Sequence, residues 1–466
     1  MGKGRAAGRA RPDLSNLAAC VEDARAAAVS AEAGPRDPVR FAPLRAAVAR
    51  TARRLPPLYR TRALEPFLRT LDRIGEAGFR RILAMDPEVR GQALVLFDVA
   101  EALQAAGAAP ATDAFLEVVS DLYDGFLSAE DRRGVKPPDR GVIPPLVKWG
   151  RPAFGPYTLP VDATAPFGLA MGVVSLPPAN AHRGLLAWGA LGHETAGHDI
   201  LGADTGLSDE LKQAVRAALR GGGATSLAEY WAARIDETAS DVMGILNMGP
   251  AAAAALVGYF RGLNAAWGSG PRLRGEGPAT DPHPADVLRG WLAAATLRLL
   301  PFSGAEAWAR AVEAETDRDA REVVLAGQAV APAQARRSAA LVAEAVVRAP
   351  VRALEGHALG AIQTWRDADD EIVDRLRAAL RGTGRLPEEI QAGTYAAHGV
   401  AAAVQEALAR GGDPARLQGR MVELLAAMHD RNASWGPLLV EHPGDLGAHV
   451  AWRRVPGSRS RRRGSL

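Results

Sequence analysis

Cysteine and lysine are both scarce in this chain of 466 residues. Cys20 is the only cysteine, which excludes an internal disulfide framework and disfavours a structural zinc site, since such sites prefer cysteine ligands. Lysine is found only at Lys3, Lys136, Lys148 and Lys212, whereas arginine and alanine are abundant. That bias suggests a GC-rich bacterial genome and says little about function.

Long apolar runs are missing as well. No stretch approaches the roughly 20 apolar residues of a membrane span, and the first eleven residues lack the apolar centre of a signal peptide. We therefore expect a cytoplasmic protein without a membrane span. Hydrophobic residues make up 48% of the chain, which is ordinary for a protein that buries a core.

Acidic residues are missing from the two ends of the chain. Residues 1–12 and 451–466 hold ten of the 56 basic residues and no acid. In the rest of the chain, residues 13–450, acidic residues therefore outnumber basic ones. We predict that both ends are disordered, solvated basic tails. Contact with nucleic acid or membrane lipids is the alternative, but the sequence carries no nucleic-acid-binding motif, so no specific nucleic acid partner is expected.

The chain between the tails divides into three regions by composition. Residues 13–133 are rich in Ala, Leu and Arg with helical periodicity. Residues 134–301 begin with a proline-rich stretch that rules out a long helix and contain two candidate strands, 154–159 and 169–176. Residues 302–450 are helical again. The sequence predicts a mainly α fold with a small β region, in which helical lobes surround a cleft.

Histidine is also scarce, yet two of the nine histidines flank a glutamate in the stretch His193-Glu194-Thr195-Ala196-Gly197-His198. An acidic stretch that contains Glu237 follows. Two imidazoles and one carboxylate are the ligands of a catalytic zinc whose fourth position stays open for water. Glu194 stands where a general base for that water would lie. These residues predict a zinc hydrolase, although manganese, cobalt or iron suit the same ligands.

The spacing of the two histidines predicts a local irregularity. Zinc helices usually carry their histidines four residues apart, on one face. His193 and His198 are five apart, which is about 140° around a regular helix. An extra residue in the turn from Glu194 to His198, a π-type bulge, would bring both rings to one ion, and Gly197 tolerates that distortion.

A second helix supplies the acidic residues. Ser226-Leu227-Ala228-Glu229 is typical of a capping box that begins it, and Gly249-Pro250 ends it. Glu237 and Asp241 are four apart and so share a face. We expect Glu237 to be the third ligand and Asp241 to accept the other N–H of a ligating histidine. Gly244, one turn further on, would allow a close approach to a neighbouring helix.

At these motifs the chain resembles the dipeptidyl peptidase III family of zinc exopeptidases. That family has His-Glu-x-x-Gly-His followed by Glu-Glu-x-x-Ala-acidic. The resemblance implies zinc on His193, His198 and Glu237, with Glu194 as base. Asp236 and Ser240 depart from the second motif, the match covers only 193–241, and the chain is shorter than that family's members. The broader clan of His-Glu-…-His peptidases with a glutamate ligand is therefore better supported than dipeptidyl cleavage.

Other site residues follow from position. The strand Met171–Leu176, which contains Val173, precedes the zinc helix. This strand could align the substrate backbone, or it could be an ordinary buried strand. Asn180 is expected to cap the zinc helix. His283, on a proline-fixed loop, could stabilise the oxyanion or cap the helix 286–300. Tyr157 is a weaker candidate for the oxyanion role.

We therefore expect one zinc ion per chain and hydrolysis of peptide bonds by a metal-activated water, with Glu194 as general base. The alternative is a non-catalytic helical scaffold on a degenerate peptidase fold. A reading without any metal also stands, because carboxylates four apart on a helix are often a solvated face. His357, His398 and His429 are expected to be packing or surface residues.

Overall fold

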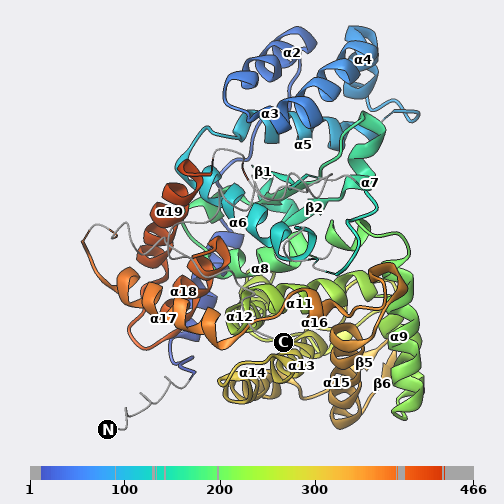
Figure 1. The fold of residues 1–466 in the computed structure, drawn as a ribbon, viewed down its shortest axis with the longest axis vertical. Coiled ribbons are helices and arrows are strands. Elements are labelled where there is room, and N and C mark those ends of the chain that lie inside the picture. Colours follow the sequence, from blue (N-terminus) through green and yellow to red (C-terminus); the bar gives the residue numbers. More distant parts are fainter. Residues whose placement is uncertain are drawn as a thin grey trace.

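The computed structural model describes residues 12–435 except 90, 129–131, 133, 141–142, 197–198, 385, 387–393 and 433–434. The predicted basic tails, 1–12 and 451–466, lie outside the described residues except for Pro12. Helices dominate and strands form two small sheets, which confirms the prediction of a mainly α fold with a small β region (Figure 1).

Helices α2 to α5 gather at one end of the molecule and lead into the long helix α6, whereas α1 lies apart from them (Figure 1). In α4 the helical periodicity predicted for residues 13–133 places Phe67 and Leu71 on the buried face, and Gly75 interrupts this helix with φ 59°. The helices of this part are α1 (Leu17–Ala28), α2 (Phe41–Arg50), α3 (Pro57–Tyr59), the π-helix η2 (Arg60–Leu64), α4 (Glu65–Leu83), α5 (Gly91–Ala105) and α6 (Pro110–Leu127).

The middle of the chain carries the sheet and the helices around the predicted site. Short 3-10 turns separate several of them, among them η3 (Pro152–Phe154) and η5 (Pro178–Ala181). The α-helices are α7 (Val161–Thr164), α8 (Leu185–Ala196), α9 (Leu207–Gly221), α10 (Ala228–Ala232), α11 (Ile235–Met248), α12 (Pro250–Ala266) and α13 (Asp286–Leu299).

The rest of the described chain is again mostly helical. The helices of this part are α14 (Ala305–Asp319), α15 (Pro332–Arg348), α16 (Leu359–Ile362), α17 (Asp367–Arg381), α18 (Ala396–Leu408) and α19 (Pro414–Asp430). Helices α17 to α19 lie together on one side of the molecule, and α15 lies on the other (Figure 1).

Each sheet has three strands. In the first, β3 (Val173–Leu176) lies between β1 (Leu146–Trp149), which runs parallel to it, and β2 (Tyr157–Leu159), which runs antiparallel. In the second, β5 (Val324–Leu325) pairs with β4 (Glu276–Gly277) and β6 (Gln328–Ala329). Both predicted strands exist but are shorter than expected, since Phe154 belongs to a 3-10 turn and β3 begins at Val173.

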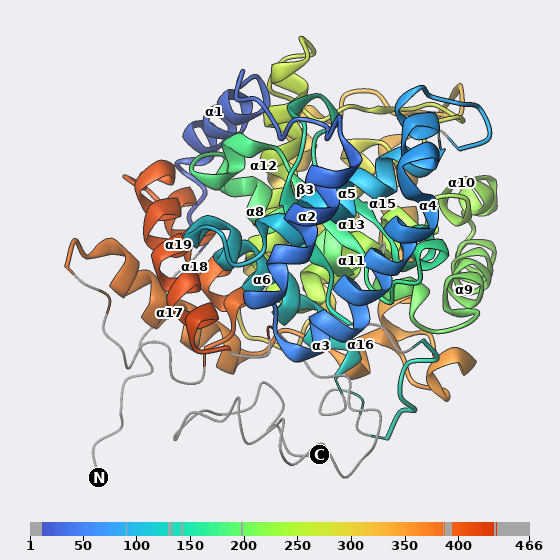
Figure 2. The same ribbon diagram turned by 90° about the horizontal axis from the view of Figure 1, so that it is seen from above.

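The core is organised around α8, which packs against α6, α11, α12 and α18. Helix α1 lies against α12 and α19, so the first and last described helices are neighbours (Figure 2). Helices from all three predicted regions therefore share one buried apolar cluster. The boundaries near residues 134 and 301 mark changes in composition, and helices on either side of them are in contact.

The described helices were also compared with the requirements of a membrane span. None of them alone has both the length and the apolar composition that a crossing needs. Only α5 and α6 taken together reach them, and this pair is bent by 112°.

Candidate active site

The site forms where α8 crosses α11 at two glycines. A Cβ atom added to Gly192 would lie 2.9 Å from the Cα of Gly244, and one added to Gly244 would lie 2.9 Å from the carbonyl carbon of Gly192. Only glycine allows backbones to approach this closely. The predicted close approach at Gly244 is thus present, and it places His193, the next residue on α8, directly against α11.

His193 contacts two carboxylates of α11, one through each ring nitrogen. Its Nδ1 lies 2.8 Å from Asp241 Oδ1, and its Nε2 lies 3.1 Å from Glu237 Oε2. The two carboxylates are one turn apart on a buried helix face. The structure therefore brings together His193, Glu237 and Asp241, three of the residues that the sequence singled out, in the relative positions predicted for a ligand pair and an orienting carboxylate.

Arg289 of α13 completes this cluster, although no sequence motif pointed to it. Its guanidinium donates to both oxygens of Asp241, from Nε at 2.7 Å to Oδ2 and from Nη2 at 2.7 Å to Oδ1. The same Nη2 lies 3.1 Å from His193 Nδ1 and 3.8 Å from Glu237 Oε2. A bidentate pair of this kind fixes the carboxylate in one orientation. The only sequence signal for it was a lone basic residue on the helix that follows His283.

Charges determine the protonation of the cluster in the metal-free protein. Burial would lower the pKa of His193, but the hydrogen bond and charge of Asp241, with the hydrogen bond to Glu237, raise it to about 10. Burial would raise the pKa of Asp241, but the charge of Arg289 and the hydrogen bond from His193 lower it. Without metal, the two carboxylates therefore favour the protonated form of His193.

Glu194 faces a cavity beside this cluster. The cavity has a volume of about 580 Å³, and Thr158, His193, Glu194, Glu237 and His283 are among its lining residues; we call it the polar cavity. Thr158 Oγ1 lies 3.1 Å from Glu194 Oε2 and 2.9 Å from the Glu194 carbonyl oxygen. The hydroxyl carries one proton, so it donates to one of these two oxygens at a time and ties β2 to the end of α8.

His283 lies at the same cavity. Its Nδ1 lies 2.9 Å from Asp281 Oδ1, its Nε2 lies 3.4 Å from Glu237 Oε1, and its side chain is 45% exposed. The N-cap residue of α13 is Ala285, and no side chain donates or accepts a capping hydrogen bond there. The His283 side chain therefore does not cap α13, and its role at the oxyanion stays a prediction.

His198 and Gly197 lie outside the described residues. Helix α8 is α-helical up to Ala196, so the predicted bulge between Glu194 and His198 stays a prediction. Within the part of the chain that is described, which omits His198, no group of three or more His, Cys, Asp or Glu residues is arranged to hold a metal.

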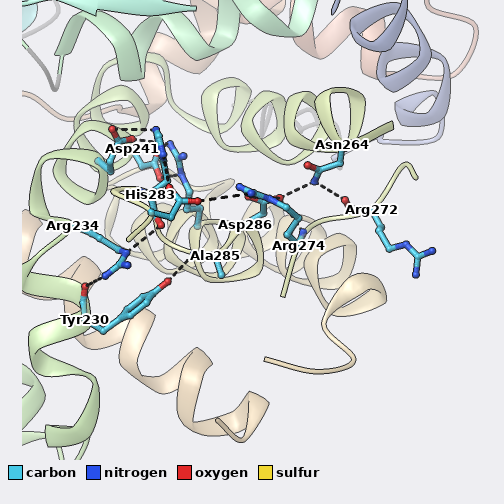
Figure 3. A network of polar contacts seen from close by, with 12 residues as sticks. Tyr230, Arg234, Asp241, Asn264, Arg272, Arg274, His283, Ala285 and Asp286 are labelled. Atoms are coloured by element: carbon cyan, nitrogen blue, oxygen red, sulfur yellow. Dashed lines mark hydrogen bonds and ion pairs between the residues drawn. The ribbon is translucent and has the colours of Figure 1, made fainter. Parts of the chain in front are cut away.

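The acidic helix differs from its prediction at its beginning. It is broken into α10 and α11 at Ala233–Arg234, and the predicted capping box is wrong, since Leu227 caps α10 without a side-chain hydrogen bond. Arg234 holds the break together. It donates to the carbonyl oxygens of Tyr230, Pro278 and His283, and so joins the start of α11 to the loop that carries His283 (Figure 3).

Of the two alternatives left open for the strand Met171–Leu176, the structure agrees with an ordinary buried strand. Strand β3 is the central strand and pairs with β1 and β2 on its two sides, so its backbone is already hydrogen bonded. Met171 and Val173 are fully buried. The strand that lines the polar cavity is the sheet-edge strand β2, through Tyr157 and Thr158. Strand order is not encoded in apolar periodicity, which is why the sequence did not distinguish the two.

Tyr157 lines the polar cavity, but its hydroxyl donates to Asp98 Oδ2 at 2.6 Å. Burial and that hydrogen bond raise the pKa of Tyr157 to about 12. Lys148 also binds Asp98, so the hydroxyl belongs to a buried polar cluster beneath the sheet. Its proton is already donated there, which argues against an oxyanion role for Tyr157.

The beginning of α8 is capped by a residue other than the one predicted. Asn180 does not cap α8; Asp23 of α1 does so, accepting the backbone N–H of Gly184 at 2.9 Å and of Leu185 at 3.0 Å.

The histidines assigned to packing make contacts that fit that role: His398 is buried with Nε2 2.9 Å from Asp369 Oδ1, and His429 Nδ1 lies 3.3 Å from Glu117 Oε2. His357 Nδ1 contacts the carbonyl oxygen of Leu354.

Comparisons with known proteins add no relative. No protein-family model, no curated protein and no solved structure matches the chain. The resemblance to dipeptidyl peptidase III therefore depends on the motif residues alone, and the function has to be argued from the geometry of His193, Glu194, Glu237, Asp241 and Arg289.

Proposed function

We propose that the chain is a zinc-dependent peptidase whose metal is held by His193, His198 and Glu237. The observation that carries the proposal is the double contact of His193, whose Nε2 faces Glu237 while its Nδ1 faces Asp241. Histidine ligands of zinc are usually oriented in this way, with the second ring nitrogen donating to a carboxylate.

The described donors fit zinc in distance and in chemistry. Two ligand atoms at about 2.0–2.1 Å from one tetrahedral zinc lie roughly 3.3 Å apart. The separation of 3.1 Å between His193 Nε2 and Glu237 Oε2 is close to that value. Imidazole nitrogen and carboxylate oxygen are both common zinc donors. His198 would supply the third.

The charge of the cluster also suits a divalent cation. With a neutral His193, as a metal ligand must be, the buried carboxylates of Glu237 and Asp241 outnumber the single guanidinium of Arg289. The cluster then carries a net negative charge in a buried environment, which a bound cation compensates. In the metal-free protein the same two carboxylates favour a proton on His193.

Each residue around the proposed site has a distinct role in amide hydrolysis. A bound zinc would supply a water of lowered pKa and polarise the scissile carbonyl. The Glu194 carboxylate accepts a proton from the attacking water and returns it to the leaving amine. Thr158, within hydrogen-bonding distance of Glu194, limits the orientations of that carboxylate. His283, half exposed beside Glu237, stands where it can donate a hydrogen bond to the developing oxyanion.

The substrate is proposed to be a peptide, since this ligand set with an adjacent glutamate base is typical of peptidases. Strand β2, at the sheet edge and along the cavity, is the element that a peptide backbone would join. We assign substrate alignment to β2 and not to the predicted strand Met171–Leu176, because β3, which lies within that strand, is paired on both sides.

The test is to measure the metal content of the full-length protein by mass spectrometry. We expect about one zinc per chain, lost in His193→Ala and in His198→Ala and retained in the control His357→Ala. Hydrolysis would be followed with a pool of synthetic peptides that have free or acetylated amino termini, which separates exopeptidase from endopeptidase action. Protein that holds no metal and cleaves no peptide after zinc is added would refute the proposal and favour a non-catalytic scaffold.

A further inference from the structure

A second cavity adjoins the polar cavity at the proposed catalytic residues. It has a volume of about 330 Å³, and we call it the aromatic cavity. The two cavities share Pro156, His193, Glu194 and His283 among their lining residues. A molecule bound across His193 and Glu194 would therefore have one cavity on each side.

One face of α12 forms the apolar wall of this cavity. The side chains that line it recur three or four residues apart, which places them in one stripe along the helix. Near Glu194 the stripe is buried, whereas Trp267, at its far end, is 66% exposed. The stripe consists of Leu256, Tyr259, Phe260, Leu263 and Trp267.

Phe154 lines the same cavity from the sheet side and is 55% exposed. Its ring packs edge-on against Tyr157, with the ring centroids 6.2 Å apart. Phe154 and Trp267 are two of the few large hydrophobic side chains that the described surface leaves exposed. Exposed apolar side chains around a concave site are typical of ligand binding.

The polar groups that line the cavity are bonded to one another. Asp286 accepts hydrogen bonds from Asn264 at 2.7 Å and from the backbone and guanidinium of Arg274 (Figure 3). Arg289 lies over the ring of Phe260, 4.4 Å from its centroid, and binds Asp241. A polar ligand would have to compete with these bonds, whereas an apolar group can pack against the α12 stripe without disturbing them.

The polar cavity lacks the apolar stripe of α12. Its lining includes the carboxylates of Asp162, Asp236 and Glu237. An apolar side chain would desolvate these carboxylates at a cost, so it is directed to the aromatic cavity. The two sides of the proposed cleavage point therefore differ in the side chains that they accept.

On this basis we infer that the aromatic cavity is a specificity subsite that takes a large apolar side chain of the peptide, such as Phe, Tyr, Leu or Met, next to the cleaved bond. This inference rests on the proposed peptidase function. It defines the substrate class as peptides with a bulky apolar residue on one side of the cleaved bond.

The first test compares matched peptides that carry Phe, Ala or Asp at the positions that flank the cleaved bond. At one of these positions we expect kcat/KM to be about 10–100-fold higher for Phe than for Ala, the range that apolar pockets achieve. Leu263→Trp, which fills the cavity, should abolish most of this preference, and Trp267→Ala should weaken it. Leu94→Ala, a 47% exposed leucine on α5, is the matched control and should leave the preference unchanged.

The second test does not depend on hydrolysis. A pentapeptide with p-benzoylphenylalanine at its centre, flanked by Ala and Gly, is photo-cross-linked to the full-length protein and the adducts are mapped by mass spectrometry. We expect adducts within residues 256–267, reduced in Leu263→Trp. Adducts on α12 would support binding of the apolar side chain in this cavity, whether or not the probe is cleaved, whereas cleavage without preference for apolar residues would refute the subsite alone. Adducts scattered over the surface would also overturn the inference.

Discussion

At the scale of single residues, the site depends on a buried charge arrangement and not on one side chain. His193 receives its orientation from Asp241, and Asp241 receives its own from Arg289. The three come from three different helices. Removing one partner leaves the others buried with uncompensated charge, which costs more than the lost hydrogen bond alone.

Asp241→Asn should weaken zinc binding about 10–100-fold, as changes to the partners of metal ligands do. Glu237→Ala should weaken it more strongly, because it removes a proposed ligand. Zinc affinity would be measured by competition with a chelator of known affinity. Equal and negligible effects of both substitutions would mean that α11 takes no part in metal binding.

Glu194→Gln should retain zinc and lose about 10²–10⁴-fold in kcat, since it removes the base and leaves the proposed ligands in place. Glu229→Gln, on the exposed surface of α10 where Glu229 pairs with Arg216, is the control and should retain the wild-type rate. Metal content and peptide cleavage measured on the same samples check both points. A Glu194→Gln enzyme with full activity would exclude Glu194 as the base.

At the scale of elements, the crossing of α8 and α11 positions the site. Gly192 and Gly244 let the two backbones meet, and the next residue on α8 is His193. The loop that carries His283 is joined to the same crossing through Arg234. The positions of the proposed ligands therefore depend on two glycines that have no side chain to contribute.

Gly244→Ala should destabilise the protein by about 1–3 kcal/mol, the range for added volume in a packed core, because backbone atoms of α8 cannot move aside as a flexible side chain would. It should also reduce zinc content, since α11 is pushed away from His193. Gly221→Ala is the control, because a Cβ there meets nothing within 4 Å. Thermal unfolding and metal analysis of both variants provide the comparison, and a Gly244→Ala protein with wild-type values would show that the helices can separate without harm.

How much of this could be predicted from the sequence differs between elements. His193, Glu237 and Asp241, which are in contact in the structure, were singled out because a zinc site requires particular residue types at particular spacings. Arg289 was not, since it is 48 residues from Asp241 and no local pattern joins them. The central position of β3 and the break before α11 were missed for the same reason: both depend on contacts with distant segments.

At the scale of the whole molecule, the helix that carries His193 is enclosed by helices from all parts of the chain. Asp23 of α1 caps its beginning, and α6, α11, α12 and α18 surround it. Stability of the site and stability of the fold should therefore be linked, and metal binding should be visible in global unfolding.

Zinc should raise the melting temperature of the full-length protein. For a ligand that binds only the folded state, free zinc at 100 times its dissociation constant adds about 2.7 kcal/mol of stability. His193→Ala should show no such rise, whereas His357→Ala should respond like the wild type. Differential scanning calorimetry with and without zinc measures this, and an equal response in all three proteins would place the metal elsewhere.

The packing of α18 against α8 also has a consequence for the order in which the protein is made. A nascent chain that ends at Arg289 already contains every residue of the proposed site, but α18 and α19 have not yet been synthesised. At about 5–20 residues per second, translation from Arg289 to the end of α18 takes roughly 6–24 s. During that interval α8 lacks the packing of α18, so the proposed activity should begin only after the last helices have docked.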